Sequence, residues 1–458
     1  MRERALEAAG HLVSDRLADL VADRPVTPRL DGPEIRARLA AFDFEEPRPT
    51  LEVAHAITQL LDEGLVQSAH ARCFGLFNPT PAFPGIVADM LSAAWNPQLA
   101  VWSHAPAAVE AELHVLTAVA QRLGLAVEPG SSHFTSGGSE ANGAALTVAL
   151  TRRFPTFGAA GAASLGAQPR VYASSESHLA WLKLLHQAGI GRQALRLVDV
   201  GADGRMDPTR LHAAIAADLD AGDIPALVVA TAGTTNAGAI DPLGPIAELA
   251  EAVGAHFHVD AAWAGAAGFS PALAPALAGI ECADSVTVDA HKWFSAPMGA
   301  GMFFCRRKAW LTDAYHVATD YMPKGAPADD FYTQSQQWSR RFIGLRLFMI
   351  LAALGREGVA AQINHQAAMG DLLKRRLGES GWRVINDTPL PVACFVDVGG
   401  AEPEAVMRRV VDTGQAWIST TRTTGHACLR ACITSFLTTE DDLEALVTAL
   451  DQARKARR

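Results

Sequence analysis

The chain has 458 residues, of which 49% are hydrophobic and 19% charged, and its 39 basic and 49 acidic residues give a net charge of −10. The apolar content is sufficient for a buried core, which excludes a mainly disordered chain. The acidic balance argues against a general nucleic-acid binder, because such a protein needs a basic surface. No apolar run approaches the ~20 residues of a bilayer span, so we predict no membrane segment.

The N-terminus and the cysteines point to a cytoplasmic protein. Residues 1–20 alternate charged and apolar side chains at helical spacing, without the apolar core and small-residue cleavage site of a secretory signal. Six cysteines are spread over the chain, and none forms a CxxC pair. In a chain of this size we interpret them as small buried side chains in a reducing compartment.

In chain order, residues 1–70 are predicted to form a helical segment that turn-rich stretches interrupt. Residues 71–340 alternate short apolar strands with amphipathic helices, which predicts a large α/β domain with a mostly parallel sheet covered on both faces. The last strand follows its predecessor without an intervening helix, which favours an antiparallel placement. The expected strands are 170–173, 195–200, 226–230, 256–259, 285–288 and 301–305.

Residues 341–458 are predicted to form a smaller α+β domain. A long helical pattern, 342–354, ends at Gly355, and two further helices alternate with strands at 393–398 and 429–434. A run of two threonines and three acidic residues, 438–442, precedes a final helix that ends at Lys455. Threonine at the cap and acids in the first turn favour a helix start there.

A lysine follows one of the predicted buried strands. Residues 285–294 read SVTVDAHKWF, so Lys292 lies at the carboxyl end of a strand, where open α/β sheets bind ligands. Apolar surroundings would make its amine nucleophilic, which indicates a Schiff-base lysine. Taken alone, the position also suits a lysine that reaches the surface, which is the commoner situation.

A carboxylate ends the preceding strand. Asp260 lies in HFHVDAAWAGAAG, about one strand–helix–strand unit before Lys292, so both side chains are predicted to face one crevice. The carboxylate could cap a helix. It could equally hold the protonated pyridine nitrogen of pyridoxal 5'-phosphate (PLP), which makes that ring an electron sink.

A glycine-rich turn is predicted to bind a phosphate. In FTSGGSEANGAA, Gly137, Gly138 and Ser139 open a helix of small residues, and a helix N-terminus with free N–H groups favours an anion. The turn lacks the Lys-Ser/Thr of an NTP-binding loop and the GxGxxG of dinucleotide folds. A phosphate other than a nucleotide's fits best, although such a turn alone is a weak signal.

Two more polar residues follow strands, and no metal site is predicted. His178 precedes an amphipathic helix, where it could stack on a cofactor ring or cap the helix. Thr235 lies in the hydroxyl-rich turn ATAGTTNAG and could reach a cofactor or cap the turn. His256 and His258 share a strand face but lack a third ligand.

In combination, the segments TSGGSEAN, HVDAAWAG, DAHKW and LRACITSFLTTEDDL resemble the group II PLP-dependent amino acid decarboxylases. That family includes aromatic L-amino acid, histidine, glutamate and 2,4-diaminobutyrate decarboxylases, and the resemblance runs from about Arg72 to the C-terminus. It implies an aspartate-aminotransferase-type fold (fold type I) with a mostly parallel, seven-stranded type of sheet. It also implies PLP as cofactor and a homodimer with active sites at the interface.

By motif position, the resemblance implies that Lys292 holds PLP as a Schiff base and that Asp260 pairs with its pyridine nitrogen. His178 and Ala262 would lie against the two faces of the ring, and Thr235 near the ring or the substrate carboxylate. Arg430 matches an arginine associated with carboxylate recognition. The residues implied around the phosphate are Gly137, Gly138, Ser139 and His291.

Tyr321 lies in TDYMPKGAPADD, whose Gly, Pro and Ala content is typical of a mobile lid loop. The resemblance places Tyr321 where the family carries a tyrosine that protonates the substrate carbon after carbon dioxide leaves. Relatives that make aldehydes have phenylalanine there. A plain lid aromatic is the alternative interpretation.

We therefore predict decarboxylation of an L-amino acid to an amine, with an aromatic or bulky apolar side chain favoured because no extra Arg/Lys pair serves an acidic one. Aromatic residues near the entry segment also suit a dimer interface. The alternatives are oxidative decarboxylation to an aldehyde, another substrate such as glutamate, aspartate or 2,4-diaminobutyrate, an aminotransferase, and a non-catalytic scaffold. The predicted substrate contacts are Phe77, Asn78, Thr80, Trp102, His104 and Arg430.

Overall fold

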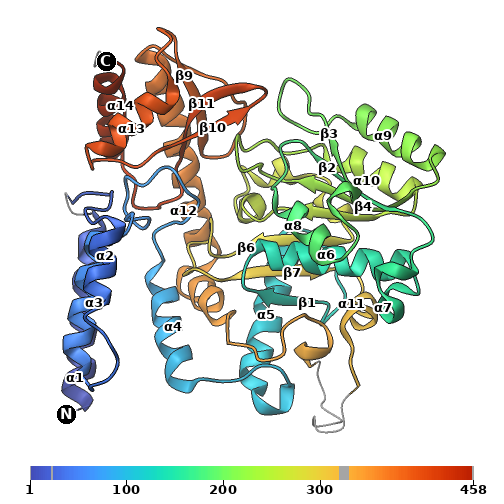
Figure 1. Ribbon diagram of the computed structural model, residues 1–458, viewed down its shortest axis with the longest axis horizontal. Helices are drawn as coiled ribbons and strands as arrows, with labels where there is room; N and C mark the ends of the chain where they lie inside the picture. The colour runs from blue at the N-terminus through green and yellow to red at the C-terminus, as the bar shows by residue number, and fades with distance from the viewer. Residues whose placement is uncertain (1, 22–23, 319–329, 456–458) are drawn as a thin grey trace.

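The computed structural model describes residues 2–21, 24–318 and 330–455. Figure 1 shows a large α/β body, a smaller C-terminal sheet with its helices, and N-terminal helices along one side. Among the helices that these ranges contain, none combines the length and apolar character needed to cross a bilayer.

The central sheet has seven strands in the order β1-β7-β6-β5-β4-β2-β3. β7 is antiparallel to both of its neighbours, β1 and β6, whereas the remaining pairs are parallel, which confirms the mostly parallel sheet and its antiparallel last strand. The strands are β1 (Ser132–Thr135), β2 (Pro169–Ser174), β3 (Leu195–Val198), β4 (Ile224–Thr231), β5 (His256–Asp260), β6 (Ser285–Asp289) and β7 (Gly301–Cys305).

Helices cover both faces of this sheet, because its strands are apolar on both sides. In β4, Leu227 and Val229 pack on one face while Val228 and Ala230 pack on the other. The first face carries α6 (Gly138–Arg153), α8 (Ala180–Gln187) and α11 (Lys308–Tyr315). The second carries α5 (Pro106–Arg122), α9 (Pro208–Asp220) and α10 (Leu243–Ala252), and the short α7 (Phe157–Ala160) follows α6.

The C-terminal sheet is antiparallel throughout, in the order β10-β11-β9-β8. Its strands are β8 (Trp382–Val384), β9 (Val392–Asp397), β10 (Ser419–Thr423) and β11 (His426–Cys432), with α12 (Leu345–Glu379), α13 (Pro403–Asp412) and α14 (Glu440–Lys455) as its helices. The two helices expected around Gly355 form one element, α12, with a kink at that glycine (φ 62°, ψ 179°). Phe74 packs in the core of this part.

The N-terminal helices are α1 (Arg2–Ala18), α2 (Gly32–Leu39), α3 (Thr50–Gly64) and α4 (Phe83–Trp95). The backbone between them joins the C-terminal part, since the N–H of Val26 donates to the carbonyl of Gly414 at 2.7 Å. Phe74 lies just after the predicted boundary at residue 70, yet it packs in the core of the C-terminal part. The domain boundaries at residues 70 and 340 therefore stay predictions.

Acid is expected to destabilise the fold through buried histidines of the central sheet. Burial lowers the pKa of His133 to about 3 and that of His258 to about 4, against about 6.5 in an unfolded chain. The unfolded chain therefore binds more protons in this window, so the free energy of unfolding should fall as pH drops from about 6.5 towards 4. For His133 alone, the loss between pH 7 and pH 5 is about 2 kcal/mol.

Urea unfolding of the apoprotein at both pH values measures this effect. The variant His133→Phe keeps an aromatic ring beside Phe303, whose ring centroid lies 5.4 Å away. Its stability should therefore depend on pH less steeply than that of the unmodified protein, by about the same 2 kcal/mol. Equal slopes for the two proteins would show that His133 is not neutral in the folded state.

Candidate active site

A cavity of about 350 Å³ lies at the carboxyl ends of β4, β5 and β6, facing the N-terminus of α6. This volume falls within the roughly 300–1,000 Å³ of small-molecule sites. The structure brings ten of the predicted residues to its walls, from segments far apart in the sequence. They are Phe77, Gly137, Gly138, Ser139, His178, Thr235, Asp260, Ala262, His291 and Lys292.

Lys292 lies in the turn that follows β6, with its Nζ 3.0 Å from Oδ2 of Asp289. His291 Nε2 lies 3.7 Å from the same oxygen. The Nδ1 of His291 accepts a hydrogen bond from the N–H of Ala300, so a neutral ring carries its proton on Nε2. Asp289 Oδ1 is buried and has no hydrogen-bond partner among the described residues.

Asp260 ends β5 and is held from two sides. Its Oδ2 accepts a hydrogen bond from Nδ2 of Asn142 at 2.7 Å, and its Oδ1 accepts one from the N–H of Ala262 at 3.1 Å. Two donors, one to each oxygen, fix the orientation of this carboxylate. Sequence reasoning missed Asn142. A signal for it existed, because asparagine is a poor helix former in an otherwise Ala-rich helix.

The glycine turn is shaped by close packing. A Cβ atom on Gly138 would lie 3.1 Å from Asp289 Oδ2 and 3.3 Å from the Cβ of Ala262. One on Gly301 would lie 2.7 Å from the Cα of Gly137, so Gly301 leaves no room for a side chain, and a side chain at Gly138 would press on its neighbours. The turn delivers the chain to the first residue of α6, where unpaired N–H groups and the helix dipole attract an anion.

His178 and Phe77 form part of the cavity walls. His178 is exposed, and its Nδ1 accepts a hydrogen bond from the N–H of Ala180 at 3.2 Å, so it contacts the start of α8 and the cavity at once. The ring of Phe77 packs against that of Trp263, with centroids 4.4 Å apart and planes 43° apart. The indole Nε1 of Trp263 is buried without a hydrogen-bond partner among the described residues.

Arg430 lies beneath Phe77, with its Cζ 4.6 Å from that ring's centroid. Its Nη1 donates to the carbonyl of Gly75 at 2.9 Å and its Nε to the carbonyl of Asn236 at 3.2 Å. Nη2 is buried and unpaired within the described part of the chain. Arg430 is therefore next to the cavity but not on its wall.

Besides Arg430, four other predicted substrate contacts are not on the cavity wall, and one predicted catalytic residue is not described. The Nδ2 of Asn78 lies 3.1 Å from Met298 Sδ, and the buried Thr80 hydroxyl donates to the carbonyl of Ala69. Trp102 Nε1 donates to Glu110 at 2.8 Å, and His104 lines a separate apolar cleft. Tyr321 lies outside the described residues.

The donor set fits PLP. An aldehyde carbon needs an amine such as Lys292, a pyridinium nitrogen needs a carboxylate such as Asp260, and a phosphate needs the N–H groups that open α6. The orphaned Oδ1 of Asp289 also indicates that a polar ligand belongs beside it. Within the described ranges no three His, Cys, Asp or Glu side chains are grouped for a metal ion.

Known proteins match the chain over most of its length. A family model described as the pyridoxal-dependent decarboxylase conserved domain matches residues 34–397. Tryptophan decarboxylase 1 of Oryza sativa subsp. japonica is 28% identical over 94% of this chain and 90% of its own. L-2,4-diaminobutyrate decarboxylase of Rhizobium meliloti (strain 1021) is 34% identical over 72% and 63%. Phenylacetaldehyde synthase of Arabidopsis thaliana is 27% identical over 96% and 94%.

A solved structure agrees with the fold. The crystal structure of Oryza sativa TDC with PLP and tryptamine superposes with a TM-score of 0.90 at 26% identity, covering 98% of this chain and 97% of that one. This likeness, together with the seven-stranded sheet and the separate antiparallel sheet, confirms the predicted fold type I.

Proposed function

This chain belongs to the pyridoxal-dependent decarboxylase family and is a PLP-dependent amino acid decarboxylase, and we propose that its substrate is an L-amino acid with an aromatic or bulky apolar side chain. One observation carries the assignment of the site. Lys292, Asp260 and the glycine turn before α6 converge on a single cavity, although they come from three separate segments.

When bound, PLP supplies an electron sink for the bond that breaks at the substrate α-carbon. We propose that Lys292 Nζ would hold the cofactor through its aldehyde carbon, and that Asp260 would keep the ring nitrogen protonated. Gly137, Gly138, Ser139 and His291 would bind the phosphate. His178 and Ala262 would orient the ring by contact with its faces, and Thr235 would contact the ring or the substrate carboxylate.

The aromatic wall supports the proposed substrate class. Phe77 and Trp263 form a contiguous ring surface at the cavity, and an apolar substrate side chain gains free energy by packing against it. The unpaired Nη2 of Arg430 lies just beneath this wall. A rotation of Phe77 would expose this nitrogen to a substrate carboxylate, which accepts strong hydrogen bonds from a charged donor.

A panel of the amino acids, scored for carbon dioxide, ammonia and amine, tests the proposal. We expect carbon dioxide and amine in equal amounts, with the highest kcat/KM for tryptophan, tyrosine, phenylalanine or leucine. A best substrate with a charged side chain would overturn the substrate class. Transfer of the amino group without carbon dioxide would instead show an aminotransferase.

We also propose that the chain works as a homodimer. An apolar cleft of about 500 Å³ lies between α4, α5 and α12, and its wall includes Leu91, Trp95, Phe342 and Phe348. Trp95 is 77% exposed, and clustered exposed apolar side chains of this kind mark protein interfaces. His104 lines the same cleft, which favours an interface over a substrate contact for this residue.

Trp95→Glu should weaken the dimer by about 2 kcal/mol or more, because buried tryptophans dominate interface energies. Sedimentation at several concentrations measures the change. Leu219→Glu, at an exposed position of α9, is the matched control and should leave the assembly unchanged. A fully active monomer would contradict the proposal.

We place this dimer in the cytoplasm, which the free thiols of all six cysteines support.

Tyr321→Phe is expected to change the product. If Tyr321 returns a proton to the α-carbon, the variant still releases carbon dioxide, but the carbon then reacts with oxygen. Oxygen and water are consumed, and aldehyde, ammonia and hydrogen peroxide replace the amine. Product analysis with and without oxygen measures this, with Tyr332→Phe as the control tyrosine. An unchanged amine yield would show that Tyr321 does not supply this proton.

A further inference from the structure

A chain of buried hydrogen bonds runs from the back of Asp260 to the protein surface. Its links are Asn142 on α6, His258 and His256 on β5, and Ser285 on β6, and it ends at Arg152. None of these groups except Asn142 lines the cavity. The groups behind Asn142 can therefore act on a ligand in the cavity only through Asn142 and Asp260.

The orientation of Asn142 is fixed by its partners. A carboxylate accepts hydrogen bonds, so the nitrogen of the amide faces Asp260 Oδ2 at 2.7 Å. The amide oxygen then accepts from the hydroxyl of Thr287 at 2.8 Å and from Nε2 of His258 at 3.1 Å. This assigns the proton of a neutral His258 to Nε2.

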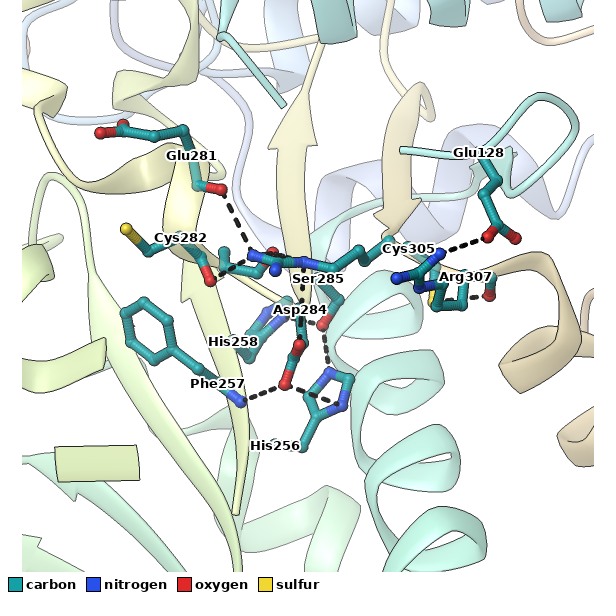
Figure 2. A network of polar contacts seen from close by, with 12 residues as sticks. Glu128, His256, Phe257, His258, Glu281, Cys282, Asp284, Ser285, Cys305 and Arg307 are labelled. Carbon is teal, nitrogen blue, oxygen red and sulfur yellow. Dashed lines mark hydrogen bonds and ion pairs between the residues drawn. The ribbon is translucent and has the colours of Figure 1, made fainter. Parts of the chain in front are cut away.

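Three further hydrogen bonds lead from His258 to Arg152. His258 Nδ1 accepts from the Ser285 hydroxyl at 2.8 Å, and Ser285 Oγ accepts from His256 Nε2 at 2.7 Å. Figure 2 shows the imidazole of His256 linked to Ser285, with the carboxylate of Asp284 also beside that ring. His256 Nδ1 must accept, because its partner at 2.6 Å is Arg152 Nη1, which can only donate.

Both imidazoles are neutral at pH 7. Burial lowers the pKa of His258 to about 4 and that of His256 well below its usual value, with Arg152 adding to the effect on His256. Asp284 Oδ2 lies 3.9 Å from His256 Nδ1, too far for a hydrogen bond, and it pairs with Arg152 at 3.2 Å instead. Every link therefore donates in one direction, from Arg152 towards Asp260.

We propose that Asn142, His258 and Ser285 are positioning residues that hold the Asp260 carboxylate aimed at the ring nitrogen of the cofactor. In this series of hydrogen bonds, donor and acceptor cannot be exchanged in one bond without being exchanged in all the others. The NH₂ group of Asn142 therefore stays turned towards the Asp260 carboxylate. The inference rests on the proposed function of Asp260, and it assigns no contact with the substrate.

The test uses the ring nitrogen itself. Dissociation constants and absorption spectra are measured for PLP and for deaza-PLP, an analogue with carbon in place of that nitrogen. His258→Phe and Ser285→Ala should weaken PLP binding by about 10- to 100-fold, because the amide of Asn142 is then free to turn and its hydrogen bond to the Asp260 carboxylate is lost. They should change deaza-PLP binding by less than about twofold, because the coupled group is missing.

His133→Phe is the matched control. His133 is as deeply buried as His258 and packs on the same ring, that of Phe303, but lies outside the chain of hydrogen bonds. It should bind both cofactors like the unmodified protein. Ser285→Ala removes one hydroxyl and serves where His258→Phe fails to fold, which melting curves reveal.

The outcomes separate this inference from the proposed function. If the variants lose equal affinity for PLP and for deaza-PLP, the hydrogen bonds only support the structure and the inference is wrong. Unchanged PLP binding in both variants would also overturn the inference. If the unmodified protein fails to bind PLP or to decarboxylate any amino acid, the proposed function itself is wrong.

Discussion

Lys292→Ala is expected to abolish turnover, by about 10⁴-fold or more, because one group would supply both covalent binding and proton transfer. Among the described residues that line the cavity, Lys292 is the one lysine, so no neighbour can replace it. The variant should also lose the yellow colour of covalently bound PLP. Its neighbour Asp289, 3.0 Å away, would then lack its counter-ion and favour a water or cation in its place.

Borohydride reduction followed by peptide mapping checks the attachment directly. In the unmodified protein the label should fall on the peptide that contains Lys292. Lys183→Ala, at an exposed position of α8, is the control and should retain colour, label and activity. A label on any other lysine, or a Lys292→Ala protein with measurable amine production, would remove Lys292 from the reaction.

Residues that follow a buried strand directly were predictable from the sequence. Asp260 and Lys292 come at or just after the ends of β5 and β6, so local sequence fixes their place at the edge of the sheet. The glycine turn precedes α6 for the same local reason. Their meeting in one cavity follows from the parallel pairing of β4, β5 and β6.

Other parts depend on contacts that no local pattern contains. β8 and β10 were missed because β8 has three residues and β10 reads STTRT, without apolar alternation. Trp102 is predicted to contact the substrate because it flanks the entry segment, but in the described structure its Nε1 donates to Glu110 and it does not line the cavity, so this contact stays a prediction. Asn142 and His258 meet across 116 positions of sequence, which periodicity cannot reveal.

Asp260→Asn is expected to lower kcat by about 10²-fold or more, because a neutral amide cannot hold a protonated ring nitrogen. The geometry adds a second effect. Both carboxylate oxygens accept from N–H donors, Oδ2 from Asn142 and Oδ1 from Ala262. The introduced NH₂ group would oppose a donor in either orientation, which costs about 1–3 kcal/mol of stability.

Asp241→Asn separates these two effects. Asp241 is equally buried, and its carboxylate accepts from the N–H groups of Met206 and Thr231, both at 2.7 Å, but it does not line the cavity. Burial raises its pKa to about 6, so the charged form of this carboxylate is disfavoured and the loss of its charge costs little. Both variants should melt at lower temperature than the unmodified protein. Only Asp260→Asn should lose most of its kcat per folded, PLP-saturated molecule, and equal kcat values for the two would exclude the electrostatic role of Asp260.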